Sequence, residues 1–290
     1  MIALAASAAS AQTITASPSV AYFTARGGQA AAQKFSLSND GDEPIRFTLR
    51  RTDFAHDDKG EMIFPAPGSS KRGLGNWLTE PPKELIVPAK GTASFDGAAL
   101  IPPSIAPGTY FGGYFALVSS EPSKAAAAAA AAGGKRKIVT QVHIATQLAL
   151  LMHVDVVAGD GKKPAATLSM SSLKVLQPSG SKPLTFEAEL DNPSEYEYGP
   201  EGTVAVFDSA GKALGKASFT RANLWPLSSR KFSAPLPLQL EPGTYRAFVA
   251  FTSDDLPVIT RQEPFAVQAG PRAAPRRTSA PGPEKTQRAP

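Results

Sequence analysis

The sequence predicts an all-β protein that consists of two β-sandwiches in tandem and a basic, disordered carboxy-terminal tail. Short segments of alternating apolar and polar residues recur from Ile14 onward, and Gly, Pro, Asn and Asp residues separate them. One phrase of turn and strand residues occurs twice, and no segment has the periodicity of an amphipathic helix. The length of 290 residues suits about two domains of ordinary size.

The first sandwich is expected to span residues 14–157. Its early strand signals include Phe35–Asn39, which alternates and ends at an Asp-Gly-Asp turn. In the next strand Ile45, Phe47 and Leu49 share one face, and polar residues occupy the other. Further short strands follow at turn-separated intervals, a cadence that is typical of antiparallel sandwiches.

The repeated phrase predicts that the second sandwich is a copy of the first. Ala106–Tyr110 and Glu241–Tyr245 share the letters Pro-Gly-Thr-Tyr, and a strand that ends in asparagine, at Asn39 and Asn192, precedes each. The Pro-Gly pair makes a turn, and the tyrosine can pack while its hydroxyl bonds to the backbone, as in immunoglobulin domains. Duplication of an immunoglobulin-like domain is favoured over chance recurrence. The second copy is expected at residues 165–268, after a Gly- and Lys-rich break.

The positive charge lies outside both predicted cores. The formal net charge is +5 and the sequence pI is about 9.3. Residues 271–290 carry five basic residues against one acid, and residues 120–137 carry four against one around a run of eight alanines. Both segments are low in complexity, which predicts a disordered tail and a flexible loop. The rest of the chain is slightly acidic, which argues against a nucleic-acid-binding face.

The amino terminus resembles a secretion signal. Residues 1–13 are rich in small apolar residues, and Ala9-Ser10-Ala11 fits a signal-peptidase cleavage site. The first basic residue is Arg26, so the usual charged start of a signal peptide is absent, and an alanine-rich terminus is the alternative. Export is favoured. No stretch approaches the roughly 20 continuous apolar residues that a membrane-spanning helix needs.

Catalytic chemistry has little support in the sequence. The chain contains no cysteine and only three histidines, and it has no G-x-S-x-G, P-loop or H-E-x-x-H motif. The densest polar cluster is interpreted as a solvated hairpin tip rather than an ion site: Asp53, His56, Asp57, Asp58 and Glu61. Glu195, Glu197 and Glu201 are expected in an exposed loop. We therefore expect no enzyme activity, no cofactor and no bound metal.

Two aromatic and basic features are assigned to structure. Trp77 and Trp225 are expected as buried core residues of their sandwiches. Arg46, Arg50 and Arg51 are interpreted as a solvated sheet face.

A long alternating strand follows the flexible loop. Residues 138–156 would extend over roughly 63 Å at about 3.3 Å per residue, which exceeds the usual length of a sandwich strand. One of its faces is apolar apart from Thr140 and Thr146. Such an edge strand is an aggregation hazard, so its presence favours a protein partner that pairs with it. The alternative is a plain, kinked final strand that closes the first sandwich.

These features resemble the periplasmic chaperones of the chaperone–usher pilus pathway. The strand before Asn39, the stretch from Trp77 to Pro88, and Tyr110–Leu117 before a variable loop carry the resemblance. It implies a periplasmic protein that lends a strand to pilin-like subunits, with an outer-membrane usher as a further partner. By this resemblance the donor side chains are Val142, Ile144, Leu148 and Leu150, and Ile138 and Arg46 are additional client contacts.

The resemblance departs from the family at its two basic anchor positions. Those positions align with Val20 and Ala149, so a site for a client's terminal carboxylate is in doubt. A second resemblance is to bacterial surface proteins that bind WxL-type wall proteins. Gly112–Tyr114 and the hairpin at Asp208–Lys212 carry it, and it implies a non-catalytic surface or periplasmic binding module.

Overall fold

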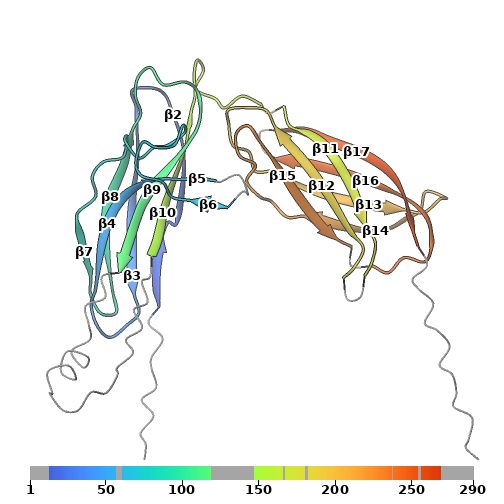
Figure 1. The fold of residues 1–290 in the computed structure, drawn as a ribbon, viewed down its shortest axis with the longest axis horizontal. Coiled ribbons are helices and arrows are strands. Elements are labelled where there is room, and N and C mark those ends of the chain that lie inside the picture. Colours follow the sequence, from blue (N-terminus) through green and yellow to red (C-terminus); the bar gives the residue numbers. More distant parts are fainter. Residues whose placement is uncertain are drawn as a thin grey trace, which may run out of the picture.

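The described part of the chain forms two β-sandwiches joined by a short linker (Figure 1). The computed structural model describes residues 13–56, 61–118, 147–165, 167–179, 182–236, 238–253 and 256–268. Every regular element within these residues is a strand, which confirms the all-β prediction. Within the same residues, no helix meets the length and hydropathy of a bilayer crossing.

The first sandwich packs a three-stranded sheet against a five-stranded sheet. The smaller sheet has the order β1 (Ile14–Ser17), β3 (Ala30–Asn39) and β8 (Gly91–Leu100). The larger sheet has the order β2 (Val20–Ala25), β10 (Gln147–Val156), β9 (Gly108–Val118), β4 (Ile45–Asp53) and β7 (Glu84–Val87). The first strand, β1, therefore pairs with β3 in the smaller sheet. The chain then crosses to the larger sheet, where β2 pairs with β10.

Period-two alternation fills the core between these sheets. Ile45, Phe47 and Leu49 of β4 are buried, as their alternation predicts, while the intervening residues are exposed. Phe35 and Leu37 of β3 are fully buried opposite them. The two sheets thus hold one continuous apolar layer.

The second sandwich repeats the plan with seven strands. One sheet has the order β11 (Ser169–Leu176), β12 (Thr185–Asn192) and β15 (Ser228–Pro235). The other has the order β14 (Ala213–Phe219), β13 (Glu201–Phe207), β16 (Gly243–Ser253) and β17 (Leu256–Val267). Its core is separate from that of the first sandwich. Residues 14–157 and 165–268 remain our proposed domain ranges.

A small hairpin, β5 (Ala55–His56) with β6 (Met62–Ile63), extends from the first sandwich toward the second (Figure 1). The buried Asp53 carboxylate anchors the neighbouring loop, because it accepts hydrogen bonds from the backbone N–H groups of Ser70 (2.9 Å) and Gly75 (2.7 Å). Asp53 therefore supports a loop, and its complete burial shows that the interpretation of this residue as part of a solvated hairpin tip is wrong. Asp57 and Asp58 lie outside the described residues.

The two copies of the Pro-Gly-Thr-Tyr phrase have the predicted geometry. The Tyr110 hydroxyl donates to the Ala106 carbonyl oxygen at 2.9 Å, and the Tyr245 hydroxyl donates to the Glu241 carbonyl oxygen at 2.7 Å. Both tyrosines pack on the core of their own sandwich. The bond that the sequence predicts for each tyrosine is therefore confirmed in both copies.

The asparagines that end β3 and β12 are also equivalent. Asn39 donates its amide to the carbonyl oxygens of Glu43 (2.7 Å) and Pro88 (3.1 Å). Asn192 donates to the carbonyl oxygens of Tyr196 (2.7 Å) and Trp225 (2.8 Å). In each copy the amide thus closes its own turn, four residues on, and ties that turn to a more distant segment.

Three sequence predictions lie outside the described residues: the leader at 1–13, apart from its last residue, the loop at 120–137 and the tail at 271–290. The long strand is described only from Gln147, so residues 138–146 stay a prediction from their alternation.

Candidate functional site

Strand β10 lies between the core of the first sandwich and the second sandwich. Its full length pairs antiparallel with β9, from Gln147 opposite Leu117 to Val156 opposite Gly108. On its other edge it pairs parallel with β2, but only from Leu151 to Val156. The two edges of β10 are therefore covered to different extents.

The segment Gln147–Leu150 has one open edge. The coverage by β2 begins where the Leu151 N–H bonds to the Ser19 carbonyl oxygen at 2.8 Å. Among the described strands, none pairs with β10 on that side before Leu151. Because β1 pairs with β3 in the opposite sheet, this stretch of β10 has no second neighbour among the strands that the structure describes. An edge of this kind can accept a further strand.

The predicted donor side chains are placed differently from one another. Leu148 is half-buried and packs against the first core, while Leu150 is fully buried within it. Leu150 therefore acts as a core residue in this structure and is not exposed to a client. Val142, Ile144 and Ile138 lie outside the described residues.

The arginines of β4 are held by local partners. Arg46 forms an ion pair with Glu84 of β7 at 2.6 Å, and Arg51 pairs with Glu80. The Arg50 guanidinium lies over the Phe115 ring at 5.2 Å from its centroid. Arg46 is exposed, so a client could reach it, but its pairing with Glu84 is sufficient to explain its presence.

The outer face of the larger sheet meets the second sandwich through an apolar cluster. We call this the interface cluster; its members are Phe54, Phe111, Leu151, Val20, Phe64, Ala149 and Trp225. The last of these comes from the second sandwich, and its ring centroid lies 4.3 Å from that of Phe111 and 5.1 Å from that of Phe54. Trp225 is therefore an interface residue rather than part of the second core as the sequence predicted, whereas Trp77 packs on the first core.

The two positions that align with the family's basic anchors belong to this cluster. Val20 and Ala149 are both partly buried and pack against its buried members. The apolar side chains at these two positions thus match their apolar surroundings, in which an anchoring cation would be buried.

A buried polar pair lies beside the interface cluster. The Nδ1 atom of His153 lies 2.7 Å from Oε2 of Glu197, and both residues are nearly inaccessible, at 4% and 6% exposure. Four aromatic rings surround the imidazole, those of Tyr22, Phe54, Phe111 and Trp225. The expectation that Glu197 lies in an exposed loop is wrong, because its loop turns inward against β10.

A second ion pair, between Lys163 and Asp155, lies beside the first. Lys163, in the linker, lies 3.0 Å from Oδ2 of Asp155 and also donates to the Glu197 carbonyl oxygen. The Thr109 hydroxyl donates to Asp155 and accepts the Glu197 N–H at 2.8 Å. Together these bonds connect β9, β10 and the linker to the turn after β12.

Burial also changes the pKa of groups at this junction. Desolvation raises the pKa of Tyr196, and the nearby Asp155 carboxylate raises it further. The Tyr196 hydroxyl accordingly stays neutral and donates to the Val156 carbonyl oxygen at 3.0 Å. Burial raises the pKa of Tyr110 and lowers that of Arg72, and each of these two groups partly offsets the effect on the other.

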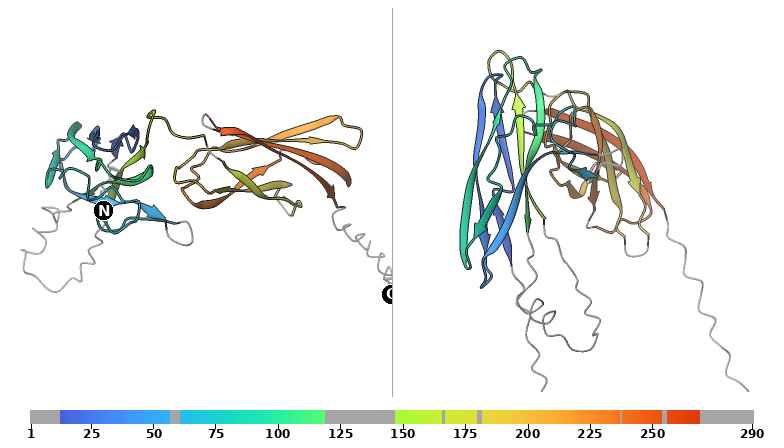
Figure 2. Two further views of the ribbon diagram at one scale, coloured as in Figure 1. Left: turned by 90° about the horizontal axis from the view of Figure 1, so that it is seen from above. Right: turned by 60° about the vertical axis from the view of Figure 1, so that its left-hand side comes forward.

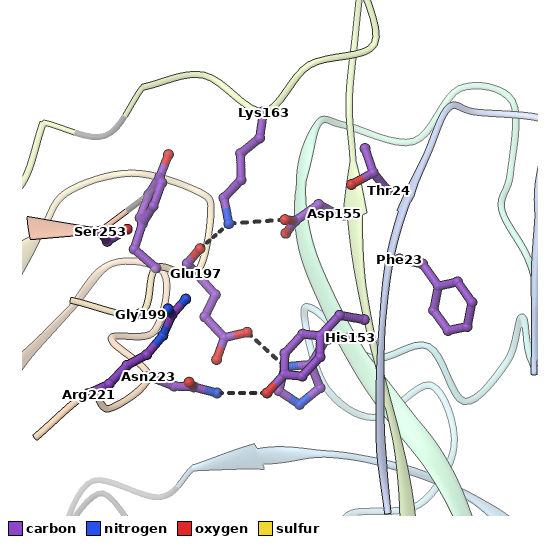
Figure 3. Close-up of a pocket in the computed structure, with 12 residues that line it drawn as sticks. Phe23, Thr24, His153, Asp155, Lys163, Glu197, Gly199, Arg221, Asn223 and Ser253 are labelled. Carbon is purple, nitrogen blue, oxygen red and sulfur yellow. Dashed lines mark hydrogen bonds and ion pairs between the residues drawn. The ribbon is translucent and has the colours of Figure 1, made fainter. Parts of the chain in front are cut away.

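The charged pairs line a cavity of about 450 Å³ between the two sandwiches (Figure 3). Tyr22, Phe23 and Thr24 of β2 form one wall, with His153 and Asp155 beside them. The other wall and the rim come from the linker and the second sandwich: Lys163, Glu197, Tyr198, Gly199, Arg221, Asn223 and Ser253. In Figure 3 the Glu197 side chain extends between Arg221 and Asn223 on one side and His153 on the other.

Sequence reasoning missed this cavity. One signal was present: His153 and Asp155 occupy alternate positions on the outward face of the strand, directly after the apolar Ala149 and Leu151 of the same face. A pair of polar residues at alternate positions indicates a polar neighbour on that face. The identity of that neighbour, Glu197, depends on how the second sandwich is placed, which local patterns do not specify.

The motifs of the second resemblance have local structural causes. A Cβ atom on Gly112 would lie 2.8 Å from Leu74 Cβ, and one on Gly113 would lie 2.1 Å from the Leu150 carbonyl oxygen. The hairpin is closed by Asp208, whose Oδ1 accepts the N–H groups of Ala210 and Lys212, both at 2.9 Å. Close packing and turn geometry thus explain both motifs. Within the described residues no group of three or more His, Asp or Glu residues could hold a metal ion.

Of the comparisons with known proteins, only the one with solved structures found matches. No family model matches the chain, and no curated protein matches it by sequence. Many of the matching solved structures are chaperones of the chaperone–usher pilus pathway, the class that the sequence resembles. One is the YadV chaperone, 14% identical, with 87% of this chain and 99% of that chain covered and a TM-score of 0.43.

Two further matches are complexes. A chain of a Salmonella enterica SafA pilin–SafB chaperone complex is 10% identical, with 90% of this chain and 99% of that chain covered and a TM-score of 0.41. A chain of a CsuC–CsuE chaperone–tip subunit complex from Acinetobacter baumannii is 12% identical, with 88% and 98% covered and a TM-score of 0.40. TM-scores this low carry no argument about function. The function is therefore argued from the residues described above.

Proposed function

We propose that this protein is a periplasmic, non-catalytic chaperone-like protein that binds pilin-type subunits by adding a client strand to the edge of β10. The observation that carries the proposal is the open edge at Gln147–Leu150. The pilin-type client comes from the sequence resemblance, and the periplasmic location from the amino-terminal residues that resemble a secretion signal.

The physics of the proposal is β-augmentation. A client strand beside Gln147–Leu150 would form backbone hydrogen bonds that no other described strand supplies at this edge. The covered edge ends at Leu151, so the added strand would be limited there by β2. The sequence alternation continues upstream to Ile138, which would lengthen the paired region if these residues join the strand.

The surroundings of this edge favour an apolar client. Leu148 and Ala149 are both half-buried on opposite faces of β10, one against the first core and the other against the interface cluster. Side chains of a client strand at this edge would therefore lie next to apolar surface on either face. A protein that lacks a strand of its own sandwich has such side chains to bury.

The test is crosslinking from a defined position. A photo-crosslinking amino acid at position 148 is expected to capture pilin-type subunits in the periplasm of cells that express them. The same group at Lys231, an exposed residue on the second sandwich, is the control and is expected to capture none. Mass spectrometry of the crosslinked bands identifies the captured proteins.

A charge at the same position should prevent capture. Leu148→Glu places a carboxylate in a half-buried apolar site, so we expect capture of the subunit to fall at least about tenfold. Circular dichroism melting of the purified variant separates a loss of binding from a loss of folding. Equal crosslinking from positions 148 and 231, or full capture by a folded Leu148→Glu variant, would contradict the proposal.

A further inference from the structure

The outer face of the second sandwich carries a hollow of about 230 Å³. Its main side chains come from three strands: Phe207 of β13, Arg246 and Phe248 of β16, and Gln262 of β17. Arg246 lies opposite Phe207 in the sheet, and Phe248 lies opposite Gln262. Alternation places Arg246 and Phe248 on the same face, because Ala247 between them is directed into the core. The strand register thus brings these four side chains together on one side of the sheet.

Arg246 gives this hollow a positive charge without a paired acid. Its side chain is exposed, and it forms no ion pair or hydrogen bond with another residue that the structure describes. Arg261 on the neighbouring strand, by contrast, pairs with Glu263 at 3.2 Å. Asp208 is engaged by its own turn, because its Oδ1 accepts the N–H groups of the residues two and four positions further on. Since no acid belongs to the described lining of the hollow, the hollow favours a negatively charged group.

The hairpin turn after β13 limits where the Arg246 guanidinium lies. A Cβ atom on Gly211 would lie 3.6 Å from Nη2 of Arg246, so the guanidinium packs against this turn. Phe248 follows two residues later on β16, roughly 7 Å further along the strand. Its ring is 43% exposed. A group that is already held in place loses little conformational freedom when it binds a ligand. The cation and the exposed ring are therefore both positioned to contact one small molecule.

We propose that this hollow binds a carboxylate that is attached to an aromatic ring. The carboxylate pairs with the Arg246 guanidinium, whose planar N–H donors match two carboxylate oxygens, and the Gln262 amide can donate a further hydrogen bond. The ring of the ligand covers Phe248 and removes its exposed surface from water. A volume of about 230 Å³ suits a single ring with a short acidic stem. The site lies on the second sandwich and is independent of the proposed strand edge.

Small probes test the two halves of this ligand separately on the full-length protein. Benzoate, benzamide and acetate are titrated, and the backbone N–H resonances of Phe248 and Gln262 are followed by NMR. Benzoate is expected to cause saturable shifts. It should bind at least about fivefold more tightly than benzamide, which lacks the charge, and than acetate, which lacks the ring. N-acetylphenylalanine distinguishes the sources of the ligand: tighter binding than that of benzoate indicates the carboxy-terminal residue of a peptide, and weaker binding indicates a free ring acid.

A matched pair of variants assigns the binding to Arg246. Arg246→Gln removes the charge at an exposed position, so we expect the affinity for benzoate to fall at least about fivefold. Arg50→Gln is the control and should leave the affinity unchanged. Arg50 is also exposed, forms no ion pair with a described residue and lies 5.2 Å from the centroid of a phenyl ring, that of Phe115, but it belongs to the first sandwich.

A third variant assigns the contact with the ring of the ligand. Phe248→Leu keeps an apolar side chain but removes the aromatic ring, so the preference for benzoate over acetate should decrease. The comparison of probes on the unmodified protein needs no variant to fold. The proposal is overturned by equal binding of benzamide or acetate, by the absence of saturable shifts, or by full affinity for benzoate in a folded Arg246→Gln variant.

Discussion

At the scale of single residues, buried polar side chains specify the turns of both sandwiches. Asn192 is 2% exposed, and its amide donates to three carbonyl oxygens, those of Tyr196, Leu224 and Trp225. Its Oδ1 accepts the N–H of Ser194 at 3.0 Å. One side chain thus bonds to four backbone groups and ties the turn after β12 to the segment before β15.

Removal of this side chain should destabilise the second sandwich. Asn192→Ala removes these side-chain hydrogen bonds, while the three carbonyl oxygens keep donors from Ser194, Tyr198 and Ser228, so we expect the free energy of unfolding to fall by about 1–2 kcal/mol. Urea unfolding followed by circular dichroism measures the loss. Asn76→Ala, at an exposed residue, is the control and should change the free energy by less than about 0.5 kcal/mol. A loss of that small size for Asn192→Ala would show that the turn does not need the side chain.

At the scale of elements, β9 shows how one strand serves two surfaces. Tyr110, Tyr114 and Ala116 point into the first core, while Phe111 belongs to the interface cluster on the opposite face. The strand is buried on both faces, and this explains why nearly all of its residues are apolar. A pattern of alternation predicts only one buried face, so it does not predict the contact of β9 with the second sandwich. The largest fully buried side chain is that of Tyr114, whose hydroxyl contacts Thr79.

The burial of Tyr114 in β9 predicts an alkaline limit to stability. Desolvation raises the pKa of Tyr114 in the folded protein, and bonds to Thr79 and Ala98 only partly offset this effect. With the folded pKa above the unfolded value of about 10, stability is intact below pH 10 and is lost as the pH rises through the folded pKa. We expect unfolding above about pH 10, together with the appearance of tyrosinate absorbance.

Variants assign this alkaline transition. Tyr114→Phe removes the ionisable hydroxyl, so its alkaline midpoint should lie at a higher pH than that of the unmodified protein. Tyr22→Phe makes the same change at a ring that is 64% exposed and serves as the matched control. An unchanged midpoint in Tyr114→Phe would assign the transition to another group.

At the scale of the whole molecule, local patterns predicted the architecture but not the junction. Turn residues and alternation predicted the all-β fold, and the repeated phrase predicted the tyrosine bonds of both copies, because each of these bonds joins residues four apart in the sequence. The junction depends on contacts between segments that are far apart: His153 with Glu197, and Trp225 with Phe111. Those residues had ordinary local explanations, so Glu197 was expected in an exposed loop and Trp225 in a core.

Figure 2 shows the two sandwiches as separate bodies joined by the linker. The junction between them has two parts, an apolar contact and a polar network. The ring of Trp225 lies 4.2 Å from that of His56 and 4.3 Å from that of Phe111, measured between centroids. Apolar contact supplies most of the attraction between packed surfaces, while buried ion pairs contribute less because of their desolvation cost. Trp225 should therefore be the main determinant of how the two sandwiches are held together.

The two tryptophans permit a direct test of this division. Trp225→Ala removes the second sandwich's ring from the interface cluster but leaves both cores complete, so we expect a larger radius of gyration in small-angle X-ray scattering and faster proteolysis of the linker at 158–164. Trp77→Ala removes a ring that packs on the first core and on Tyr110, 4.9 Å away between centroids. That variant should lose about 2–4 kcal/mol of stability in the first sandwich with no change in the scattering. If the scattering of Trp225→Ala matches that of the unmodified protein, the polar contacts hold the junction without this ring, among them the His153–Glu197 pair, the Tyr196–Val156 bond and the Arg72–Glu195 pair.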